Sequence, residues 1–187
     1  GVDIAHGPGV DEVCDIHGLA KRFGENAFDL VVATEVIEHI RDWRHGISNL
    51  KRVLKPGGTL IVTTRSRGFP YHGHPFDFWR FESNDMKDVF SDFVNADIMK
   101  DPDPDSPGVF VKARKPSSGF SENNLSDCRL FSIITKKRQA EILDCEIKKN
   151  NALRFFTHGV PRFFKNIERS LRPRRILKRF RDVSRGS

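Results

Sequence analysis

Cysteine is scarce in this chain of 187 residues, and long apolar runs are missing altogether. The three cysteines, Cys14, Cys128 and Cys145, stand at unrelated spacings, so the sequence predicts neither a disulfide framework nor a zinc-ligand pattern. No apolar stretch reaches the length of a membrane-spanning helix, and no internal repeat indicates a solenoid. This cysteine usage is typical of a reducing compartment, and we expect a cytoplasmic protein.

Acidic residues become scarce towards the end of the chain, although the net charge of the whole is only +7. Residues 136–187 hold 16 Lys and Arg against 5 Asp and Glu, whereas acids exceed bases in the remainder. This shift predicts a mildly acidic domain over residues 1–115 and a basic helical tail over residues 136–187. Residues 116–135, rich in Ser and Asn, are expected to be a polar linker that can add an edge strand at 130–135.

A strand–helix–strand pattern is the clearest signal in the first half of the chain. Residues 28–33 are apolar on both faces, as a strand of a parallel sheet requires. Residues 35–54 carry apolar side chains at helical spacing, with a break near 41–43. Pro56-Gly57-Gly58 stops the helix, and residues 59–64 form the next strand. The order predicts a right-handed βαβ unit with parallel strands.

Shorter elements flank this unit. Residues 2–4 and 10–14 have the composition of short strands, and Ser83 can cap a further helix. Residues 94–99 and 109–113 have strand patterns on either side of a segment rich in Asp and Pro, which predicts a hairpin. This order resembles the class I S-adenosylmethionine-dependent methyltransferases over residues 1–115. The resemblance implies an α/β fold with a doubly wound, Rossmann-like, mostly parallel sheet and a C-terminal antiparallel hairpin.

The glycine-rich loop of that family has no clear counterpart here. Residues 4–9 imitate it, but only 18 residues separate Gly9 from Phe28, too few for a helix and two strands. This spacing, and a first residue that is not methionine, favour a domain that lacks its first strand and loop through N-terminal truncation. We expect such a fragment to be unstable or inactive alone.

The resemblance implies a binding site for S-adenosylmethionine at the ends of three strands. Its residues would be Asp3, Ile4, Asp15, Ile16, Thr34 and Glu35. The two oxygens of Asp3 suit the vicinal ribose hydroxyls, and Asp15 would meet the adenine amino group with Ile16 along the base. Two plainer interpretations stay open: Asp3 as a solvated carboxylate at a strand end, and Asp15 as a helix cap.

Glu35, Glu38 and His39 fall at i, i+3 and i+4, which predicts that they share one face at the start of a helix. With His74 as a fourth ligand, they could bind Mg²⁺ or Mn²⁺. The Glu-x-x-Glu-His motif resembles those of small-RNA 2′-O-methyltransferases and ubiquinone-pathway O-methyltransferases, in which a metal lowers the pKa of the acceptor hydroxyl. Two alternatives are that His39 is a general base or substrate contact without metal, or that the motif is structural.

Residues 72–81 resemble a His-x-x-Pro-x-Asp-Tyr-x-Arg-Tyr loop of methyltransferases that modify glycans and lipids. Phe78 and Phe81 stand in place of its tyrosines, and we expect Asp77 and Arg80 to form an internal ion pair. The candidate catalytic residues are His39, His72 and His74.

Ten Lys and Arg alternate with apolar residues in 161–187, where Phe163, Ile167 and Leu171 form a stripe. A basic amphipathic helix suits an anionic membrane surface, while nucleic acid or the domain itself are competing partners. We expect a methyltransferase acting on an oxygen of a sugar, a lipid-linked glycan or a small molecule, cytoplasmic or peripheral at the membrane. The alternatives are a non-catalytic module that docks to membrane or RNA, and an RNA 2′-O-methyltransferase.

Overall fold

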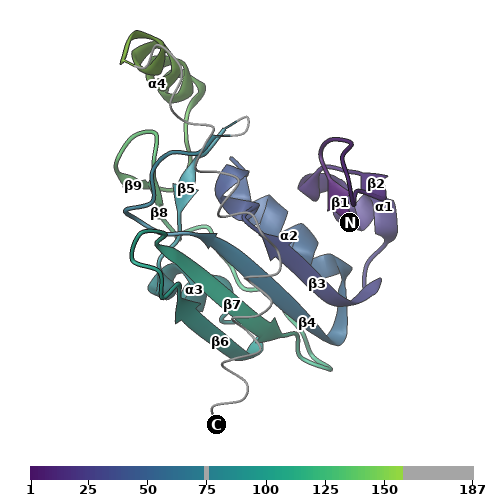
Figure 1. Ribbon diagram of the computed structural model, residues 1–187. Helices are drawn as coiled ribbons and strands as arrows, with labels where there is room; N and C mark the ends of the chain where they lie inside the picture. Colours follow the sequence, from purple (N-terminus) through teal and green to yellow (C-terminus); the bar gives the residue numbers. More distant parts are fainter. Residues whose placement is uncertain (74–75, 158–187) are drawn as a thin grey trace. The chain divides into compact units, whose positions relative to one another are not determined.

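The computed structural model describes residues 1–73 and 76–157, the last six of them by their backbone alone (Figure 1). The chain divides into two compact units, residues 1–147 and 148–187. Its helices and strands are β1 (Val2–Asp3), β2 (Glu12–Val13), η1 (Ile16–Gly18), α1 (Leu19–Phe23), β3 (Phe28–Thr34), η2 (Ile37–His39), α2 (Trp43–Val53), β4 (Leu54–Arg65), β5 (Trp79–Arg80), α3 (Ser83–Val89), β6 (Val94–Lys100), β7 (Gly108–Arg114), β8 (Leu130–Ser132), β9 (Arg138–Gln139) and α4 (Asp144–Thr157). His74 and the apolar stripe of residues 161–187 lie outside the described residues.

A four-stranded sheet in the order β3-β4-β7-β6 forms the centre of the first unit. β3 and β4 pair in parallel, from Leu30 opposite Thr59 to Thr34 opposite Thr63, and α2 connects them. β7 pairs antiparallel with β4 on one side and with β6 on the other. The sheet is therefore mixed rather than mostly parallel, because β7 enters it antiparallel to both of its neighbours.

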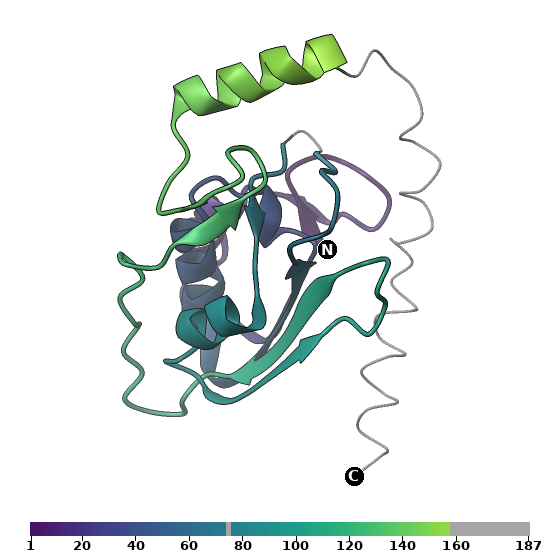
Figure 2. The same ribbon diagram turned by 90° about the vertical axis from the view of Figure 1, so that its left-hand side faces the viewer.

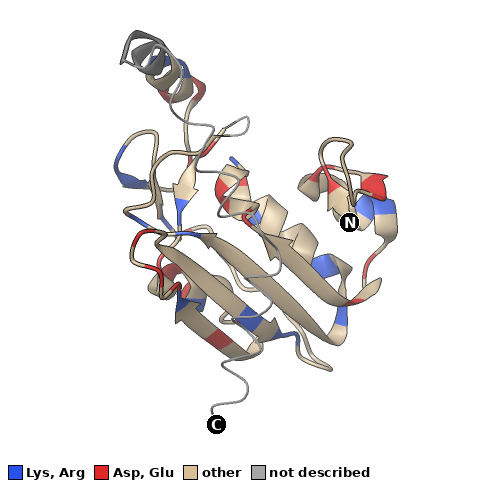
Figure 3. Cartoon of the chain, viewed as in Figure 1, with Lys and Arg blue, Asp and Glu red and all other residues tan. Residues whose placement is uncertain are grey.

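Helices α2 and α3 cover the same face of this sheet (Figures 1 and 2). Ile47 of α2 is completely buried in one core with Leu60 and Val62 of β4. Leu30 and Val32 of β3 are instead 54% and 50% exposed. The predicted doubly wound arrangement, with helices on both faces, is therefore not found among the described residues. Figure 3 shows that β3 and β4 carry charge only near their ends, as strands of a sheet core should.

The helix predicted over residues 35–54 begins only at Trp43. Glu35 has a left-handed backbone with φ of 57°, and its N–H still donates to Thr63 O at 2.9 Å. A single 3₁₀ turn, η2, follows, and the chain then extends before α2 begins. The expectation that the Glu-x-x-Glu-His motif occupies one face of a helix was wrong, because backbone pairing with β4 continues one residue beyond β3.

Both ends of α2 are held by polar side chains. At its start, the Asp42 carboxylate accepts from the N–H of His45 at 3.3 Å. At its end, the ammonium of Lys115 donates to the carbonyls of Lys51 and Leu54 at 2.8 and 2.7 Å. These contacts satisfy helix-end groups that have no partner within the helix. They anchor both ends of α2, the helix that connects β3 to β4 along the chain.

Two smaller sheets flank the central one. β1 and β2 form a separate parallel pair, shorter than the predicted strands 2–4 and 10–14. β5, β8 and β9 form an antiparallel sheet, so residues 138–139 are a strand although a helical tail was predicted from 136 onward. Arg138 pairs with Asp85 of α3, a distant contact that local periodicity does not contain.

Residues 116–135, predicted to be a polar linker, are part of the first unit, and arginines of the region around α2 hold them and the residues that follow. The guanidinium of Arg44 donates to the carbonyls of Leu125, Cys128 and Ala140. That of Arg41 donates to the carbonyl of Ile142. None of the described helices is both long and apolar enough to cross a bilayer.

Candidate active site

Glu35 and Arg65 stand at neighbouring strand ends. Glu35 directly follows β3 and Arg65 ends β4, so parallel pairing brings both to the carboxyl edge of the sheet. Thr63 Oγ1 donates to Glu35 Oε1 at 3.0 Å, and Glu35 Oε2 pairs with Nε of Arg65. Both side chains are more than nine-tenths buried. Sequence reasoning missed Arg65, although polar residues after the apolar strand 59–62 could have indicated it.

Glu38 lies in η2, shortly after Glu35, and is completely buried. Thr64 Oγ1 donates to its Oε2 at 2.9 Å, and Nε2 of His72 lies 3.6 Å from its Oε1. The N–H of Phe78 donates to the backbone carbonyl of Glu38 at 2.9 Å. The turn η2 thus joins the strand edge to the loop before β5.

The loop before β5 is organised by the predicted ion pair of Asp77 with Arg80, which is confirmed. The two carboxylate oxygens of Asp77 accept from Arg80 at 2.6 and 2.7 Å, and both side chains are fully buried. Nδ1 of His72 lies 2.9 Å from Oδ2 of Asp77, which also accepts from the His72 N–H. His72 is therefore held between two carboxylates, Asp77 and Glu38.

Burial changes how these groups titrate. It raises the pKa of Glu35 to about 7. The negative charge of Glu38 contributes to this increase, and the positive charge of Arg65 opposes it. Burial alone would lower the pKa of His72, but bonds to Asp77 and Glu38 raise it to about 9. Burial would also raise the pKa of Asp77, yet Arg80 and His72 hold it well below its usual range. At neutral pH, His72 is thus a cation and Asp77 an anion, whereas Glu35 holds its proton more tightly than an exposed carboxyl group does.

His39, like His72, is half-buried. Its Nδ1 lies 2.6 Å from the carbonyl oxygen of Phe76, so this nitrogen carries the hydrogen and Nε2 offers a lone pair. Its ring lies edge-on to that of His72, with 4.7 Å between the centroids. One ligand atom each of Glu38, His39 and His72 lie within 4.8 Å of one another. The structure thus brings two of the three predicted catalytic histidines together.

The residues predicted to bind the cofactor lie at two strand edges. β1 and β2 are parallel neighbours, so Asp3 and Asp15 follow at the same edge of that pair. Asp3 is exposed beside Ile4, which is 57% exposed, whereas Ile16 is buried. Thr34 and Glu35 lie at the corresponding end of β3. Asp15 also caps η1, since its Oδ1 accepts from the N–H of His17 at 2.8 Å.

Comparisons with known proteins relate part of this chain to methyltransferases. Residues 5–62 match a family described as a methyltransferase domain. Human mitochondrial ubiquinone biosynthesis O-methyltransferase is 42% identical over 52 residues, which are 28% of this chain and 14% of that protein. Phosphoethanolamine N-methyltransferase 2 of Caenorhabditis elegans is 35% identical over 51 residues, 27% of this chain and 12% of that protein. The matched stretch thus spans about one seventh or less of these relatives.

A crystal structure with a similar fold is that of Burkholderia thailandensis 1,6-didemethyltoxoflavin-N1-methyltransferase, with bound 1,6-didemethyltoxoflavin and S-adenosylhomocysteine. Its TM-score is 0.50 at 18% identity, and the likeness covers 62% of this chain and 60% of that one. At this identity the likeness concerns the fold, and the predicted α/β, Rossmann-like class is confirmed at that level.

Proposed function

We propose that this chain, which carries a class I S-adenosylmethionine-dependent methyltransferase domain, methylates an oxygen of a sugar, a lipid-linked glycan or another small molecule. The observation that carries the proposal is the group of Glu38, His39 and His72 at the carboxyl edge of β3 and β4. When bound, S-adenosylmethionine supplies an electrophilic methyl group on sulfur. The residues proposed to hold it are Asp3, Ile4, Asp15, Ile16, Thr34 and Glu35.

His39 is the proposed general base. Nε2 of His39 would take the proton of an acceptor hydroxyl as that oxygen receives the methyl group, while the electrons of the broken methyl–sulfur bond would stay on the departing S-adenosylhomocysteine. The bond from Nδ1 to Phe76 O orients the ring for this step. His72 positions His39 by ring contact and is itself fixed by Asp77. The chain therefore contributes alignment and proton removal, which is what an in-line displacement requires.

The test is a turnover assay of His39→Gln with hydroxyl and amine acceptors. We expect kcat/KM to fall by about 10²- to 10⁴-fold, while affinity for S-adenosylhomocysteine is unchanged. His6→Gln changes an exposed histidine that is not among the proposed catalytic or cofactor-binding residues, and it is the matched control. Turnover equal to the unchanged protein would remove His39 from the mechanism, and turnover with amines alone would overturn oxygen as the acceptor.

The cofactor site has its own test, which is calorimetric titration of S-adenosylhomocysteine. Asp3→Asn keeps the size of the side chain and removes the charge, so we expect binding to weaken. Asp29→Asn, at an exposed carboxylate at the other end of β3, should bind as the unchanged protein does. A well-folded protein that binds no S-adenosylhomocysteine would overturn the methyltransferase proposal.

A divalent metal is the alternative way to activate the acceptor. The sequence predicts Glu35, Glu38, His39 and His74 as its ligands. Glu35 is not free to bind a metal, because Thr63 and Arg65 engage its two carboxylate oxygens. Glu38 and His39 offer a carboxylate and an imidazole to one Mg²⁺ or Mn²⁺, whereas His72 would first have to lose a ring proton that it shares with Glu38 or Asp77. A metal on His39 would occupy the lone pair that a base needs. Loss of turnover in EDTA, restored by Mn²⁺, would favour the metal; unchanged turnover favours the free base.

We further propose that residues 161–187 contact an anionic membrane, because ten Lys and Arg there alternate with apolar side chains. Such contact would place a lipid-linked acceptor near the enzyme. Sedimentation with phosphatidylserine vesicles is expected, and should be lost when residues 161–187 are deleted. Binding to RNA but not to vesicles would instead favour the RNA-methylating alternative.

A further inference from the structure

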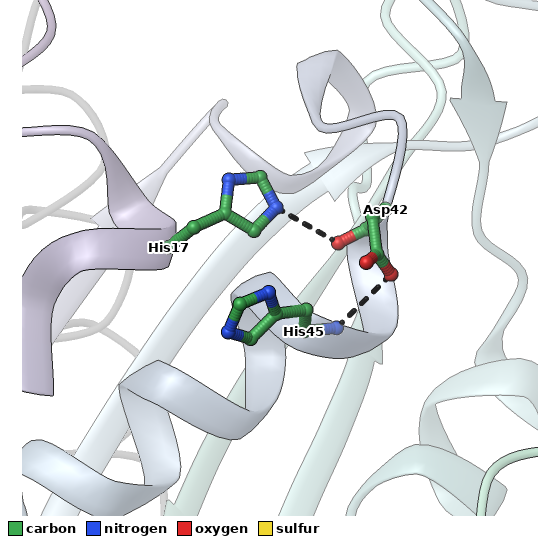
Figure 4. A group of neighbouring side chains, drawn as sticks. All are labelled: His17, Asp42 and His45. Carbon is green, nitrogen blue, oxygen red and sulfur yellow. Dashed lines mark hydrogen bonds between the residues drawn. The ribbon is translucent and has the colours of Figure 1, made fainter.

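A second cluster of metal-ligating side chains lies away from Glu38 and His39, where η1 meets the start of α2. His17 comes from η1, Asp42 is the cap of α2, and His45 lies in the first turn of α2 (Figure 4). One ligand atom from each of the three lies within 4.8 Å of the others. Asp42 and His45 are exposed and His17 is half-buried, so an ion from solvent can reach them.

A carboxylate stands behind His17 and orients it. Nδ1 of His17 lies 2.6 Å from Oδ1 of Asp15, so this nitrogen donates its hydrogen to the carboxylate. Metal-binding histidines usually donate their second ring nitrogen in this way, which fixes the tautomer and strengthens the ligand. The other nitrogen, Nε2, is thereby turned towards Asp42 and His45 (Figure 4).

Nε2 of His17 also lies 3.2 Å from the backbone carbonyl oxygen of Asp42. With the hydrogen on Nδ1, a neutral ring presents a lone pair to that oxygen, and two acceptors do not attract each other. A positive charge between them resolves the contact, either a second proton on the ring or a bound cation. A cation that takes the place of that second proton would contact both atoms.

We propose that His17, Asp42 and His45 bind one transition-metal ion of the Zn²⁺ type, with Asp15 as the outer carboxylate. Two imidazoles and one carboxylate are a donor set that Zn²⁺ accepts, and the remaining position would be taken by water. The ion links η1 to the start of α2, two segments that are far apart in sequence. The methyl-transfer proposal uses neither histidine, but it shares Asp15 with this site, so zinc affinity is measured in the absence of S-adenosylmethionine.

The test is titration of the full chain with zinc chloride, followed by calorimetry and by thermal unfolding. A single ion per chain is expected, together with a higher Tm in its presence, because binding to the folded state stabilises it. His17→Ala and His45→Ala should each abolish this binding. Asp15→Asn should weaken it by about 10- to 100-fold, as expected for an outer carboxylate.

Two control variants distinguish binding at this site from zinc binding by other side chains of the protein. His6→Ala removes an exposed histidine outside the cluster, and Glu38→Gln alters the candidate active site; zinc affinity should be unchanged in both. Far-UV circular dichroism establishes that the His17 and His45 variants are folded. Absence of zinc binding by the folded chain would overturn the proposal. Zinc binding that persists in both variants, through the three cysteines or Glu38, would overturn it as well.

Discussion

Histidine and carboxylate side chains meet at two places among the described residues, and the two places differ in how deeply they are buried. Around His72, the carboxylates of Glu38 and Asp77 are fully buried and arginines compensate charge nearby. Around His17, Asp15 and Asp42 face solvent. Coulomb interactions are strong in the first environment and screened in the second. The same residue types therefore form an ion-pair network that determines loop structure in one place and an accessible ligand cluster in the other.

The largest difference should appear when one partner of the buried Asp77–Arg80 pair is removed. Asp77→Ala leaves the Arg80 guanidinium completely buried without its carboxylate. We expect a loss of about 3–5 kcal/mol in the free energy of unfolding, measured by urea denaturation. Asp29→Ala is the matched control, because its partner Lys55 is 42% exposed, and it should cost less than about 1 kcal/mol. Equal losses in both variants would contradict the comparison.

The buried network should also make stability depend on pH. Glu35 has its pKa raised from 4.5 to about 7, and the His72 pKa is raised from 6.5 to about 9. A raised pKa means that the folded state holds the proton more tightly, so this stability is present at low pH and is lost as pH rises. The free energy of unfolding should fall between pH 4.5 and 7 through Glu35, and between 6.5 and 9 through His72.

Glu35→Gln isolates the lower half of this range. Its amide does not titrate, so the fall between pH 4.5 and 7, on the order of 2 kcal/mol, should disappear while the fall at higher pH remains. Urea denaturation at stepped pH measures both. A profile with the same slope in the variant would show that Glu35 titrates alike in the folded and unfolded chain.

At the exposed cluster, the effect of a substitution should be smaller and should depend on metal. Asp42→Ala removes the cap of α2 and is expected to cost about 1 kcal/mol without metal. With zinc chloride present, the difference from the unchanged protein should widen, because only the latter gains from binding. Asp42→Asn, which retains capping, should show the metal-dependent part alone. An identical cost with and without zinc would contradict the proposed site.

The smallest effect is expected at the exposed pair of Glu12 and Arg22. Arg22 Nε donates to Glu12 Oε1 at 2.8 Å, but the two side chains are 33% and 54% exposed. Glu12→Gln should therefore change the free energy of unfolding less than any of the substitutions above, and less again in high salt. A large loss that does not depend on salt would show that exposure does not govern these pairs.

Local patterns determined the parts of the fold that depend on neighbours in sequence. The strands predicted at 28–33 and 59–64 lie within β3 and β4, although β4 already begins at Leu54, where a helix end was predicted. These strands, a helix between them and the Asp77–Arg80 pair were predictable, because periodicity and short spacing contain that information. The sequence likewise identified the Glu-x-x-Glu-His motif as a candidate site, before its position in the fold was known. Its assignment to one helix face was wrong, since the motif's first residue is still bonded to β4.

Only the tertiary structure decided which charged side chains from distant parts of the sequence meet. Glu35 and Arg65 are 30 positions apart, and Asp85 and Arg138 are 53 apart, so no local pattern links them. Strand pairing brings Glu35 and Arg65 into a common buried environment, and burial then raises the pKa of Glu35. Chain segments remote in sequence likewise place Asp42 beside His17. The sequence determined the elements and their order, whereas packing between them determined the chemistry of both sites.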